Sequence, residues 1–413
     1  MSEVIVIGGG AAGMLAARRA AELGASVTLL EKNERLGMKI LISGGGKCNL
    51  THDGPMEDVR AKFRPNEARF LKPSFYKFTN AQFLDILHTR GMETYVRPDG
   101  RVFPVEPANA KDVAALLTGY VEEVGVQVRY SSPVTGLVAE NGRIVGVQVG
   151  GEMLSASRVI VSTGGSSYPA TGTTGDGWPW LTTLGHSLVT LRAALAPLYF
   201  HAAASDWSGV ALRDCALRAR AGTGGKEFMR WQGDLLFTHK GVSGPTALGV
   251  SREVAERHGH EKENVVEVDL APGLTWEELQ AELRRQATDA PRKTVSALAA
   301  PFVPSRLLEP LLLAANVSGE TRGSALKAKD LNRLVTTLKG WPLGTVRHVP
   351  LERGEVVAGG VALEEVDPQT MRSKLVDGLF LCGEVLDIAG PVGGYNLQAA
   401  WSTGWVAGEA AAK

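Results

Sequence analysis

A run of glycines directly after a short apolar segment constrains this chain more than any other feature. Residues 4–7 read Val-Ile-Val-Ile, which is typical of a buried parallel strand, and residues 8–13 follow the pattern G-x-G-x-x-G. The pattern predicts a helix from about Met14 to Leu23, a second strand from Ala25 to Leu30, and Glu31 at the end of that strand. A glycine turn between a strand and a helix, followed about 20 residues later by an acidic side chain, indicates a dinucleotide-binding unit.

Each position of this unit has an expected role. Gly8 permits the tight turn, Gly10 lets the start of the helix approach a pyrophosphate, and Gly13 packs the helix against the strand. Glu31 can accept a hydrogen bond from a ribose hydroxyl. Units of this kind bind both NAD and FAD, so the unit by itself leaves that choice open.

A second glycine loop follows and favours the longer cofactor. Residues 37–49 read Gly-Met-Lys-Ile-Leu-Ile-Ser-Gly-Gly-Gly-Lys-Cys-Asn. A simple NAD dehydrogenase does not need such a loop, whereas the ribityl chain and isoalloxazine ring of FAD extend well past the pyrophosphate. Backbone N–H groups here can line the flavin, and Lys39 or Lys47 can offset phosphate or reduced-flavin charge. A solvated surface position is the alternative for each lysine.

Composition excludes several classes of protein. Of the 413 residues, 44% are hydrophobic and 21% are charged, which excludes a disordered or fibrous chain. Lys plus Arg and Asp plus Glu number 44 each, so a general nucleic-acid binder is not indicated, although a local basic face remains open. Cys48, Cys215 and Cys382 have no metal-ligand spacing, and the N-terminus has no signal-peptide pattern. We expect no metal site and a soluble, cytoplasmic protein.

The segment from 126 to 162 changes to alternating strands joined by hairpin turns. The expected strands are 126–130, 134–139, 144–149 and 159–162. The last one ends in Thr163-Gly164-Gly165, the kind of turn by which a strand meander returns to the sheet in FAD domains of the glutathione-reductase class. By that similarity, Val134 lies near the adenine, and Thr163 and Gly164 lie near the dinucleotide. The loop 169–177 is either a flavin-side lid or a connector.

The C-terminal stretch is expected to return to the first domain. Residues 378–384 form a strand that ends in Gly383-Glu384, and Gly393-Gly394 precede a final helix from Leu397 to about Ala412. The positive end of that helix, aimed at the N1/O2 edge of a flavin, would stabilise the charge that arrives with a hydride. Glu384 or Asp387 would accept from ribityl hydroxyls. There is no second G-x-G-x-x-G, so NAD(P)H could bind only transiently.

Residues 190 to 345 have no nucleotide-binding pattern and are expected to form an insertion. Its second part has helical apolar spacing over Trp276–Thr288, Ser305–Ala315 and Ser324–Leu338. In its first part, Ser243 is a candidate cap for the helix that begins at Pro245.

Two features of the insertion have alternative interpretations. His258-Gly259-His260 is interpreted as a solvated loop rather than a metal site. Residues 284–347 contain eleven Lys or Arg against four Asp or Glu. This segment is either an ordinary helical surface or a face for RNA phosphates.

Together these motifs resemble those of the aminoacetone-oxidase-type FAD-binding flavoproteins of bacteria, also called RdsA/BaiN-like. The shared segments are Gly8–Gly13, Glu31-Lys32-Asn33, Gly37 with Lys39, Ser43–Asn49, Phe237–Pro245 and Gly359–Gly404. Lys47 stands where the family usually has Arg, which keeps the charge but loses the bidentate fork. Val357 stands where relatives often have Thr. The matched segments span both ends of the chain and a central point.

The resemblance implies an α/β fold with a Rossmann-like FAD-binding domain of the glutathione-reductase class. That domain would consist of residues 1–190 and 345–413, with an insertion at 191–344 that is β-rich over 191–272 and helical over 273–344. FAD is the expected cofactor and NAD(P)H a candidate transient reductant. Cys48, His239 and Tyr395 are candidates for a catalytic role, although Cys48 and His239 could equally be structural. The predicted cofactor-binding residues are Gly8, Gly10, Ala11, Ala12, Gly13, Glu31, Lys32, Lys39, Ser43, Gly44, Gly45, Gly46, Lys47, Cys48, Asn49, Val134, Thr163, Gly164, Gly383, Glu384, Asp387, Gly394, Tyr395, Asn396 and Leu397.

An FAD-dependent oxidoreductase of this family has several candidate substrates: a small amino ketone, a bile acid, or a uridine of ribosomal RNA. We favour a reductase that uses NAD(P)H, with the ribosomal RNA uridine as the leading substrate. A uridine would have to be flipped out or single-stranded to reach the flavin. A small-molecule amine oxidase and a non-catalytic, redox-sensing flavoprotein remain alternatives. No membrane association and no stable protein partner are expected.

Overall fold

The structure is a computed structural model that describes residues 2–259 and 263–413. The chain divides into two compact units, and each is described by itself. The first unit is Met1–Arg192 with Glu355–Lys413, and the second is Ala193–Gly354. These bounds lie within ten residues of the expected ones.

A five-stranded sheet forms the centre of the first unit, and every pairing in it is parallel. Its strands, in spatial order, are β19 (Leu379–Leu381), β10 (Arg158–Val161), β1 (Glu3–Ile7), β2 (Ser26–Leu30) and β6 (Gln127–Arg129). Because parallel strands are covered on both faces, their residues are almost continuously apolar, and β1 is buried over its last four positions. The predicted Rossmann-like α/β fold is confirmed.

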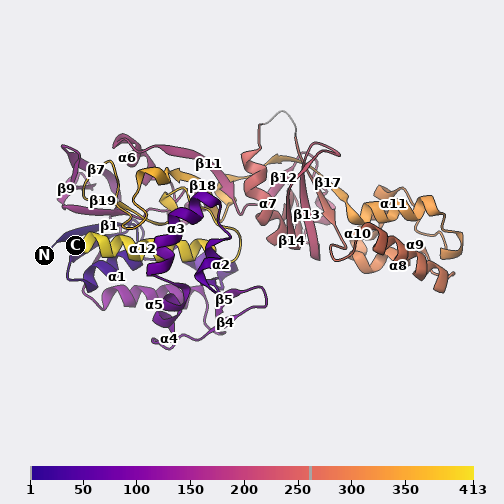
Figure 1. Cartoon of the computed structure of the whole chain (residues 1–413), viewed down its shortest axis with the longest axis horizontal. Helices are drawn as coiled ribbons and strands as arrows, with labels where there is room; N and C mark the ends of the chain where they lie inside the picture. The colour runs from indigo at the N-terminus through magenta and orange to yellow at the C-terminus, as the bar shows by residue number, and fades with distance from the viewer. Residues whose placement is uncertain (1, 260–262) are drawn as a thin grey trace. The chain divides into compact units, whose positions relative to one another are not determined.

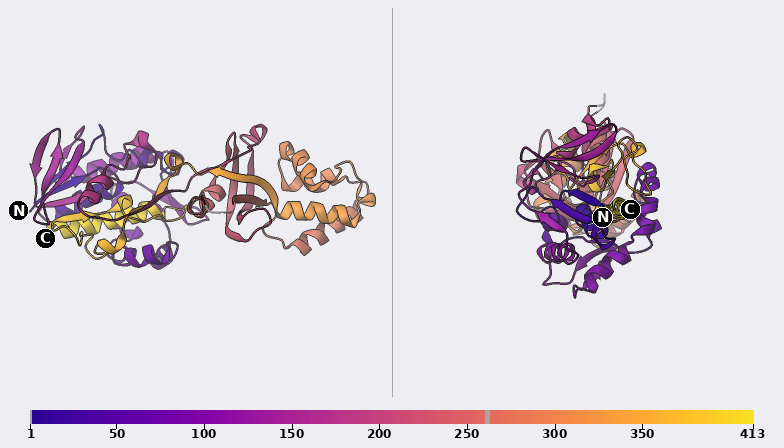
Figure 2. Two further views of the ribbon diagram at one scale, coloured as in Figure 1. Left: turned by 90° about the horizontal axis from the view of Figure 1, so that it is seen from above. Right: turned by 90° about the vertical axis from the view of Figure 1, so that its left-hand side faces the viewer.

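The two ends of the chain meet in this unit. Helix α12 (Tyr395–Ala412) packs along α1 (Ala11–Glu22), and α5 (Ala110–Glu122) contacts α1 as well. Figures 1 and 2 show α1 and α12 side by side. The Ser2 hydroxyl donates to the Ala412 carbonyl at 3.1 Å. The last helix begins at Tyr395, two residues before the expected position, because Gly394 is its N-cap.

The expected strand at 126–130 is not part of the meander. It is β6, which pairs with β2 at the edge of the parallel sheet, because alternation along a strand does not say which strand it pairs with. The meander itself is a separate antiparallel sheet with one strand that the sequence analysis missed, β9. Its strands are β7 (Val134–Glu140), β8 (Arg143–Val149) and β9 (Glu152–Ser155).

Smaller elements complete the first unit. An antiparallel sheet of order β3-β5-β4 follows the second glycine loop, and β11 pairs with β18. The bounds are β3 (Thr51–His52), β4 (Thr94–Val96), β5 (Arg101–Pro104), β11 (Leu188–Ala194), β18 (Val356–Val361), α2 (Met56–Arg60), α3 (Pro65–Lys77), α4 (Asn80–His88) and α6 (Gly177–Thr183). The loop 169–177 contains a 3-10 turn at Pro169–Thr171 and leads into α6.

The second unit is a closed six-stranded barrel with helices α8, α9, α10 and α11 at one end (Figure 1). One apolar core joins the two parts, since residues of the barrel and of the helices belong to the same buried cluster. The strands, in spatial order, are β12 (Leu198–Phe200), β15 (Gly241–Ser243), β14 (Glu227–Thr238), β13 (Ala211–Ala221), β16 (Asn264–Asp269) and β17 (Trp341–His348). The helices are α7 (Pro245–Glu256), α8 (Trp276–Asp289), α9 (Val295–Ala299), α10 (Ser305–Ala315) and α11 (Ala328–Lys339).

Two local predictions in this unit were wrong. Ser243 does not cap α7: it lies in β15, and the N-cap is Gly244, whose φ of 87° suits glycine. Helix α11 begins at Ala328 rather than at residue 324, because a separate 3-10 turn occupies Gly323–Ala325. The apolar residues of α11 at helical spacing, Leu331, Leu334, Val335 and Leu338, form its buried face, and they do not fix where the helix begins.

Among the described residues, no single helix has both the length and the apolar character to cross a membrane. One pair, Val295–Phe302 and Ser305–Ala315, could do so by length and composition only, and the two helices are bent by 118°.

The close packing of α12 on α1 generates a stability prediction. A Cβ at Gly404 would lie 2.2 Å from the Ala12 carbonyl oxygen, a backbone atom that cannot move aside. Gly404→Ala should therefore cost about 1–3 kcal/mol, the usual range for overpacking. Gly119→Ala is the control, since its Cβ meets nothing within 4 Å, and it should stabilise α5 by about 0.5–1 kcal/mol. Thermal unfolding of both variants tests this, and equal melting temperatures would contradict it.

Candidate active site

The first glycine loop is packed on one side and open on the other. Gly8 has a φ of 97°, and a Cβ there would lie 2.7 Å from the Ser162 carbonyl oxygen. A Cβ at Gly13 would lie 1.9 Å from the Gly8 oxygen, so α1 begins in direct contact with the end of β1. Gly10 is the N-cap of α1, and a Cβ there would meet nothing within 4 Å. The free N–H groups of the first turn therefore face open space that suits a pyrophosphate.

Glu31 holds this loop in place. Its buried carboxylate accepts the Gly9 N–H at 2.8 Å through Oε2, and the backbone and side-chain amides of Asn33 at 2.8 and 2.7 Å through Oε1. A ribose hydroxyl would therefore join a carboxylate that already orders the turn. The neighbouring Lys32 forms an ion pair with Asp176 and donates to Thr174, which fixes the end of the 169–177 loop.

The second glycine loop bends back on itself. Ser43 is extended, and Gly44 and Gly45 have φ values of 57° and 67°, within the 3-10 segment Ile40–Gly46. The Ser43 carbonyl accepts the Cys48 N–H at 3.0 Å, and Cys48 itself has a φ of 59°. A Cβ at Gly45 would meet nothing within 4 Å, so this loop also presents open backbone.

The structure separates the two lysines of this loop. Lys39 Nζ lies 2.6 Å from Glu384 Oε2 and 2.9 Å from Ser167 Oγ, so it is a half-buried member of the site. Lys47 is 55% exposed and pairs with Glu106 at 2.9 Å, and this pairing raises the pKa of Lys47. The surface alternative therefore describes Lys47 but not Lys39.

The two C-terminal carboxylates hold the edge of strand β18. Glu384 Oε1 accepts the Val357 N–H and Asp387 Oδ1 accepts the Gly359 N–H, each at 2.9 Å. A Cβ at Gly165 would lie 2.9 Å from Glu384 Oε1, so the Thr163-Gly164-Gly165 turn lies against the same carboxylate. Glu384 and Asp387, the predicted acceptors for ribityl hydroxyls, thus also hold the backbone of the site. A ribityl hydroxyl would have to share carboxylate oxygens that already accept backbone N–H groups.

The start of α12 lies over strand β3. A Cβ at Gly394 would lie 2.4 Å from the Thr51 carbonyl carbon. With its amide oriented to satisfy both groups, Asn49 accepts the Gly394 N–H at 2.8 Å and donates to the Thr51 oxygen at 3.1 Å. Asn396 accepts the Gly390 N–H and donates to the Gly390 carbonyl, which closes the preceding loop. The first turn of α12 has no acidic side chain and no side-chain cap, so its positive potential is retained.

Two buried hydroxyls test whether these residues fit FAD. Among the described residues, neither Thr163 Oγ1 nor Ser166 Oγ has a hydrogen-bond partner, although both atoms are buried. Buried polar groups are nearly always paired, so a polar ligand beside this turn would supply what is missing. Together with the open backbone at Gly10 and Gly45, these hydroxyls fit a dinucleotide that runs from the first loop to the second.

The remaining predicted cofactor residues lie at the start of α1, β7 and α12 or in contact with them. Ala12 is buried and contacts Gly383, where a Cβ would lie 2.8 Å from the Ala12 Cβ. Ala11 begins α1, Val134 begins β7 in a buried position, and Leu397 is half-buried in the first turn of α12.

The catalytic candidates are placed in different surroundings. Cys48 is fully buried, and burial raises its pKa to about 12, so it is a neutral thiol at physiological pH. Tyr395 is 4% exposed and stacks on His52 with ring centroids 4.6 Å apart, and burial raises its pKa. His239 belongs to the second unit, where it is exposed in the turn between β14 and β15.

His52 is a candidate that the sequence analysis missed. Its Nδ1 lies 3.0 Å from the Gly393 carbonyl oxygen, and its ring stacks on Tyr395, the first residue of α12. A single histidine three residues after the end of a glycine loop gives no recognisable pattern. The contact between β3 and the start of α12 is what reveals it.

A buried Ser–His–Glu arrangement lies elsewhere in this unit. His186 Nε2 is 2.9 Å from Ser373 Oγ, and its Nδ1 is 3.1 Å from Glu365 Oε2. Ser373 Oγ also accepts the N–H groups of Leu375 and Val376, and burial lowers the His186 pKa. Ser373 and His186 are buried, and Ser373 and Glu365 both accept backbone N–H groups, so the three residues hold the chain together rather than form a nucleophilic site.

No cluster of three or more metal-ligating side chains occurs in the ranges 2–259 and 263–413. His258 ends the α7 region in a turn, whereas His260 lies outside the described residues.

The open backbone at Gly10 predicts a selective loss of cofactor. Gly10 has extended φ and ψ of −81° and −169°, so alanine is accommodated there without backbone strain. Its methyl group would enter the space assigned to the pyrophosphate, and Gly10→Ala should weaken FAD binding by about tenfold or more while the apo-protein keeps its melting temperature. FAD titration of the apo-protein measures this, with Gly119→Ala as the control. Unchanged FAD affinity would place the pyrophosphate elsewhere.

The buried cysteines predict slow thiol chemistry. Burial raises the pKa of Cys215 to about 12, as it does for Cys48, and raises that of Cys382 as well. Because the thiolate is the reactive form, the native protein at pH 8 should react with a disulfide reagent far more slowly than free cysteine does. Unfolding in urea should release all three thiols. Rapid modification of one thiol in the folded protein would show that its surroundings are open.

Comparisons with known proteins agree with this geometry. A family profile described as "HI0933-like protein Rossmann domain" matches residues 2–410. The chain is 31% identical over 412 residues to a ribosomal RNA dihydrouridine synthase of Haemophilus influenzae, covering 98% of this chain and 97% of that protein. It is 29% identical over 415 residues to a 3-dehydro-bile acid delta(4,6)-reductase of Clostridium scindens, covering both chains completely.

A solved structure shares the fold. The 3-ketosteroid delta1-dehydrogenase of Sterolibacterium denitrificans superposes with a TM-score of 0.54 at 15% identity over the whole of both chains. At that identity the likeness concerns the fold alone. The match over residues 2–410 shows that the chain belongs to the HI0933-like Rossmann family, and with its full-length relatives it is an FAD-dependent oxidoreductase.

Proposed function

We propose that the chain uses NAD(P)H to reduce a carbon–carbon double bond conjugated to a carbonyl group, with a uridine of ribosomal RNA as the substrate. Dihydrouridine is uridine with a saturated C5–C6 bond, and a delta(4,6) reduction also saturates carbon–carbon double bonds. The two names therefore describe one reaction type: a hydride and a proton add across the double bond while NAD(P)H is oxidised. FAD supplies the hydride-transfer chemistry when it is bound.

The chain's own residues supply electrostatic groups that this reaction needs. The uncapped start of α12 offers N–H groups and a positive dipole for negative charge at the pyrimidine edge of a flavin. Lys39 is fixed beside Glu384, which places a half-buried ion pair between the second glycine loop and the C-terminal segment. The absence of a second G-x-G-x-x-G in the sequence supports transient rather than resident binding of NAD(P)H.

One observation carries the choice of RNA: exposed cations without acidic partners gather in the helical part of the second unit. Segment 291–294 runs beside segment 321–324, with the Gly323 N–H donating to the Lys293 carbonyl at 2.8 Å and a bridge between Thr294 and Arg322. The exposed cations near this crossing, none of them in an ion pair among the described residues, are Arg292, Arg322, Lys327 and Lys329. Cations that are left unpaired in this way suit RNA phosphates.

Two other functions make distinct predictions. A small-molecule amine oxidase would consume oxygen with amines and be indifferent to NAD(P)H. A non-catalytic flavoprotein would bind FAD without turnover with any donor and acceptor. Anaerobic addition of NADPH or NADH to the FAD-loaded protein, followed by protein-free ribosomal RNA, separates all three. Bleaching of the flavin absorbance and a gain of two hydrogen atoms in an RNA fragment would support the proposal, and bleaching by amines alone would overturn it.

Charge reversal tests the RNA assignment. The triple variant Arg292→Glu, Lys327→Glu, Lys329→Glu should bind RNA at least about tenfold more weakly and show a shallower salt dependence, by about one unit of slope for each lost phosphate contact. FAD content should stay the same, because these residues belong to the second unit.

The control carries the same change in net charge at exposed lysines elsewhere, namely Lys62→Glu, Lys72→Glu and Lys226→Glu. It should bind RNA nearly as well as the parent protein does. Equal RNA binding by the parent protein and the triple variant would remove the basic segment from the RNA site.

A further inference from the structure

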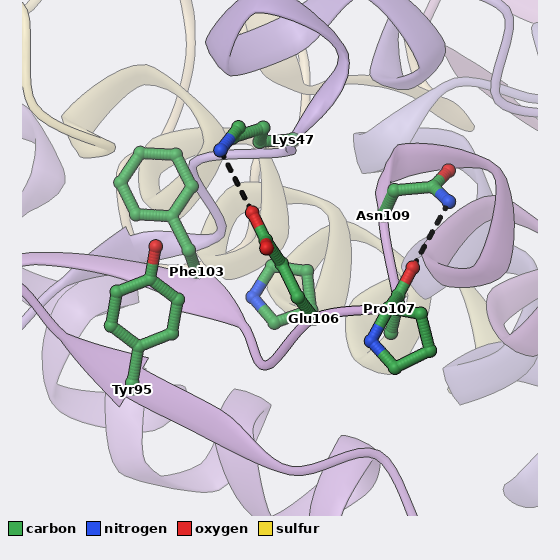
Figure 3. Close-up of a pocket in the computed structure, with 8 residues that line it drawn as sticks. Lys47, Tyr95, Phe103, Glu106, Pro107 and Asn109 are labelled. Carbon is green, nitrogen blue, oxygen red and sulfur yellow. Dashed lines mark hydrogen bonds and ion pairs between the residues drawn. The ribbon is translucent and has the colours of Figure 1, made fainter.

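A cavity of about 260 Å³ lies beside the second glycine loop. Figure 3 shows the rings of Tyr95 and Phe103 on one side and the Lys47–Glu106 ion pair next to them, with Pro107 and Asn109 further along the wall. None of the functional assignments above uses this cavity. Of the predicted cofactor residues, only Lys47 lines the cavity. The cavity therefore lies next to the second glycine loop without being part of the cofactor site.

The wall of the cavity is in direct contact with the second glycine loop. A Cβ at Gly44 would lie 3.1 Å from Phe103 Cε1, so the phenyl ring rests against the loop backbone. The Leu50 N–H donates to the Val102 carbonyl at 2.9 Å, and β3 pairs with β5 at Thr51 and Val102. A ligand in this cavity would therefore be held at a defined place next to the loop.

Tyr95 gives the cavity an exposed aromatic surface. It is the cross-strand partner of Phe103, and the two rings lie 6.1 Å apart at an interplanar angle of 28°. Phe103 is 2% exposed, and the Arg97 guanidinium lies 4.0 Å from its ring centroid, whereas Tyr95 is 36% exposed. The backing ring keeps Tyr95 in place while part of its surface stays free, which is the arrangement of a stacking platform.

Lys47 and Glu106 are the charged residues of the cavity wall, and the preference for an anionic ligand comes from Arg97, which lies over the ring of the lining residue Phe103. Lys47 and Glu106 form an exposed pair, which is readily exchanged for another partner. Arg101 is paired with Asp99, but Arg97 is in no ion pair among the residues described. The half-buried Arg97 guanidinium lies over the Phe103 ring and is not within ion-pair distance of a described carboxylate, so it is suited to a phosphate.

We infer that this cavity binds a base of the RNA strand next to the uridine that is reduced, with the base stacked on Tyr95 and its phosphate near Arg97. The volume is below the roughly 300–1,000 Å³ of sites that enclose drug-sized ligands, so it suits one flat ring rather than a fused steroid nucleus. This inference rests on the proposed RNA function, and it adds a specificity-determining subsite to it.

Binding of a short fluorescein-labelled oligouridylate to the oxidised FAD-loaded protein, followed by fluorescence anisotropy, tests the subsite. Tyr95→Ala should raise Kd roughly 5- to 100-fold, the usual effect of losing one stacked base. Tyr95→Phe keeps the ring and should bind like the parent. Tyr76→Ala is the matched control, since Tyr76 is 87% exposed in α3 of the same unit. Arg97→Gln should reduce the slope of log Kd against log salt by about one.

The outcomes separate the subsite from the function. If the parent protein reduces ribosomal RNA uridine and Tyr95→Ala binds the oligonucleotide as tightly as the parent does, the subsite is wrong and the function stands. If the parent neither binds the oligonucleotide nor reduces the RNA, both fall. If Tyr95→Ala changes KM for a 3-keto-Δ4 steroid but not the oligonucleotide Kd, the cavity accepts apolar rings and the inference is overturned.

Discussion

The contact between α1 and α12 is the constraint on which the rest of the first unit depends. Cβ atoms at Gly404 and Gly408 would each lie 2.2 Å from carbonyl oxygens of Ala12 and Ala16, so the two helices touch backbone to backbone. This contact carries the end of the chain back to its beginning and places Gly383 against Ala12. The open turn at Gly10 and the start of α12 can therefore act on one ligand although about 380 residues separate them.

Within this frame, polar side chains order the loops before any ligand arrives. Glu31 ties the first turn to Asn33, Lys39 joins the second loop to Glu384, and Asn396 closes the loop before α12. Preorganisation of this kind reduces the conformational entropy that is lost on binding, because the backbone N–H groups of the loops already have the orientation that a ligand needs. The buried hydroxyls of Thr163 and Ser166 have no hydrogen-bond partner among the described residues, so a polar ligand there would complete this ordering.

Short sequence patterns predicted where helices and strands lie better than they predicted which strands pair and which residues cap a helix. The strand-turn-helix around Gly8–Gly13 and the helices at 276 and 305 follow from glycine geometry and apolar period. The helices at 276 and 305 begin where they were expected, whereas α1 begins at Ala11, three residues before the expected Met14. Segment 126–130 was assigned to the wrong sheet, because a half-buried strand has the same alternation whichever neighbour it pairs with. The helix at Pro245 begins where it was expected, but its N-cap is Gly244 rather than Ser243, because a cap depends on φ and ψ that composition does not reveal.

The sequence by itself determined the dinucleotide turn, the FAD-type second loop and the family, since each depends on residues adjacent in the chain. The tertiary structure decided which side chains share a site. It placed Lys39 on Glu384 but Lys47 on Glu106, stacked His52 on Tyr395, and set Tyr95 opposite Phe103. These contacts join segments far apart in the chain, so they depend on how the elements pack and not on any local pattern.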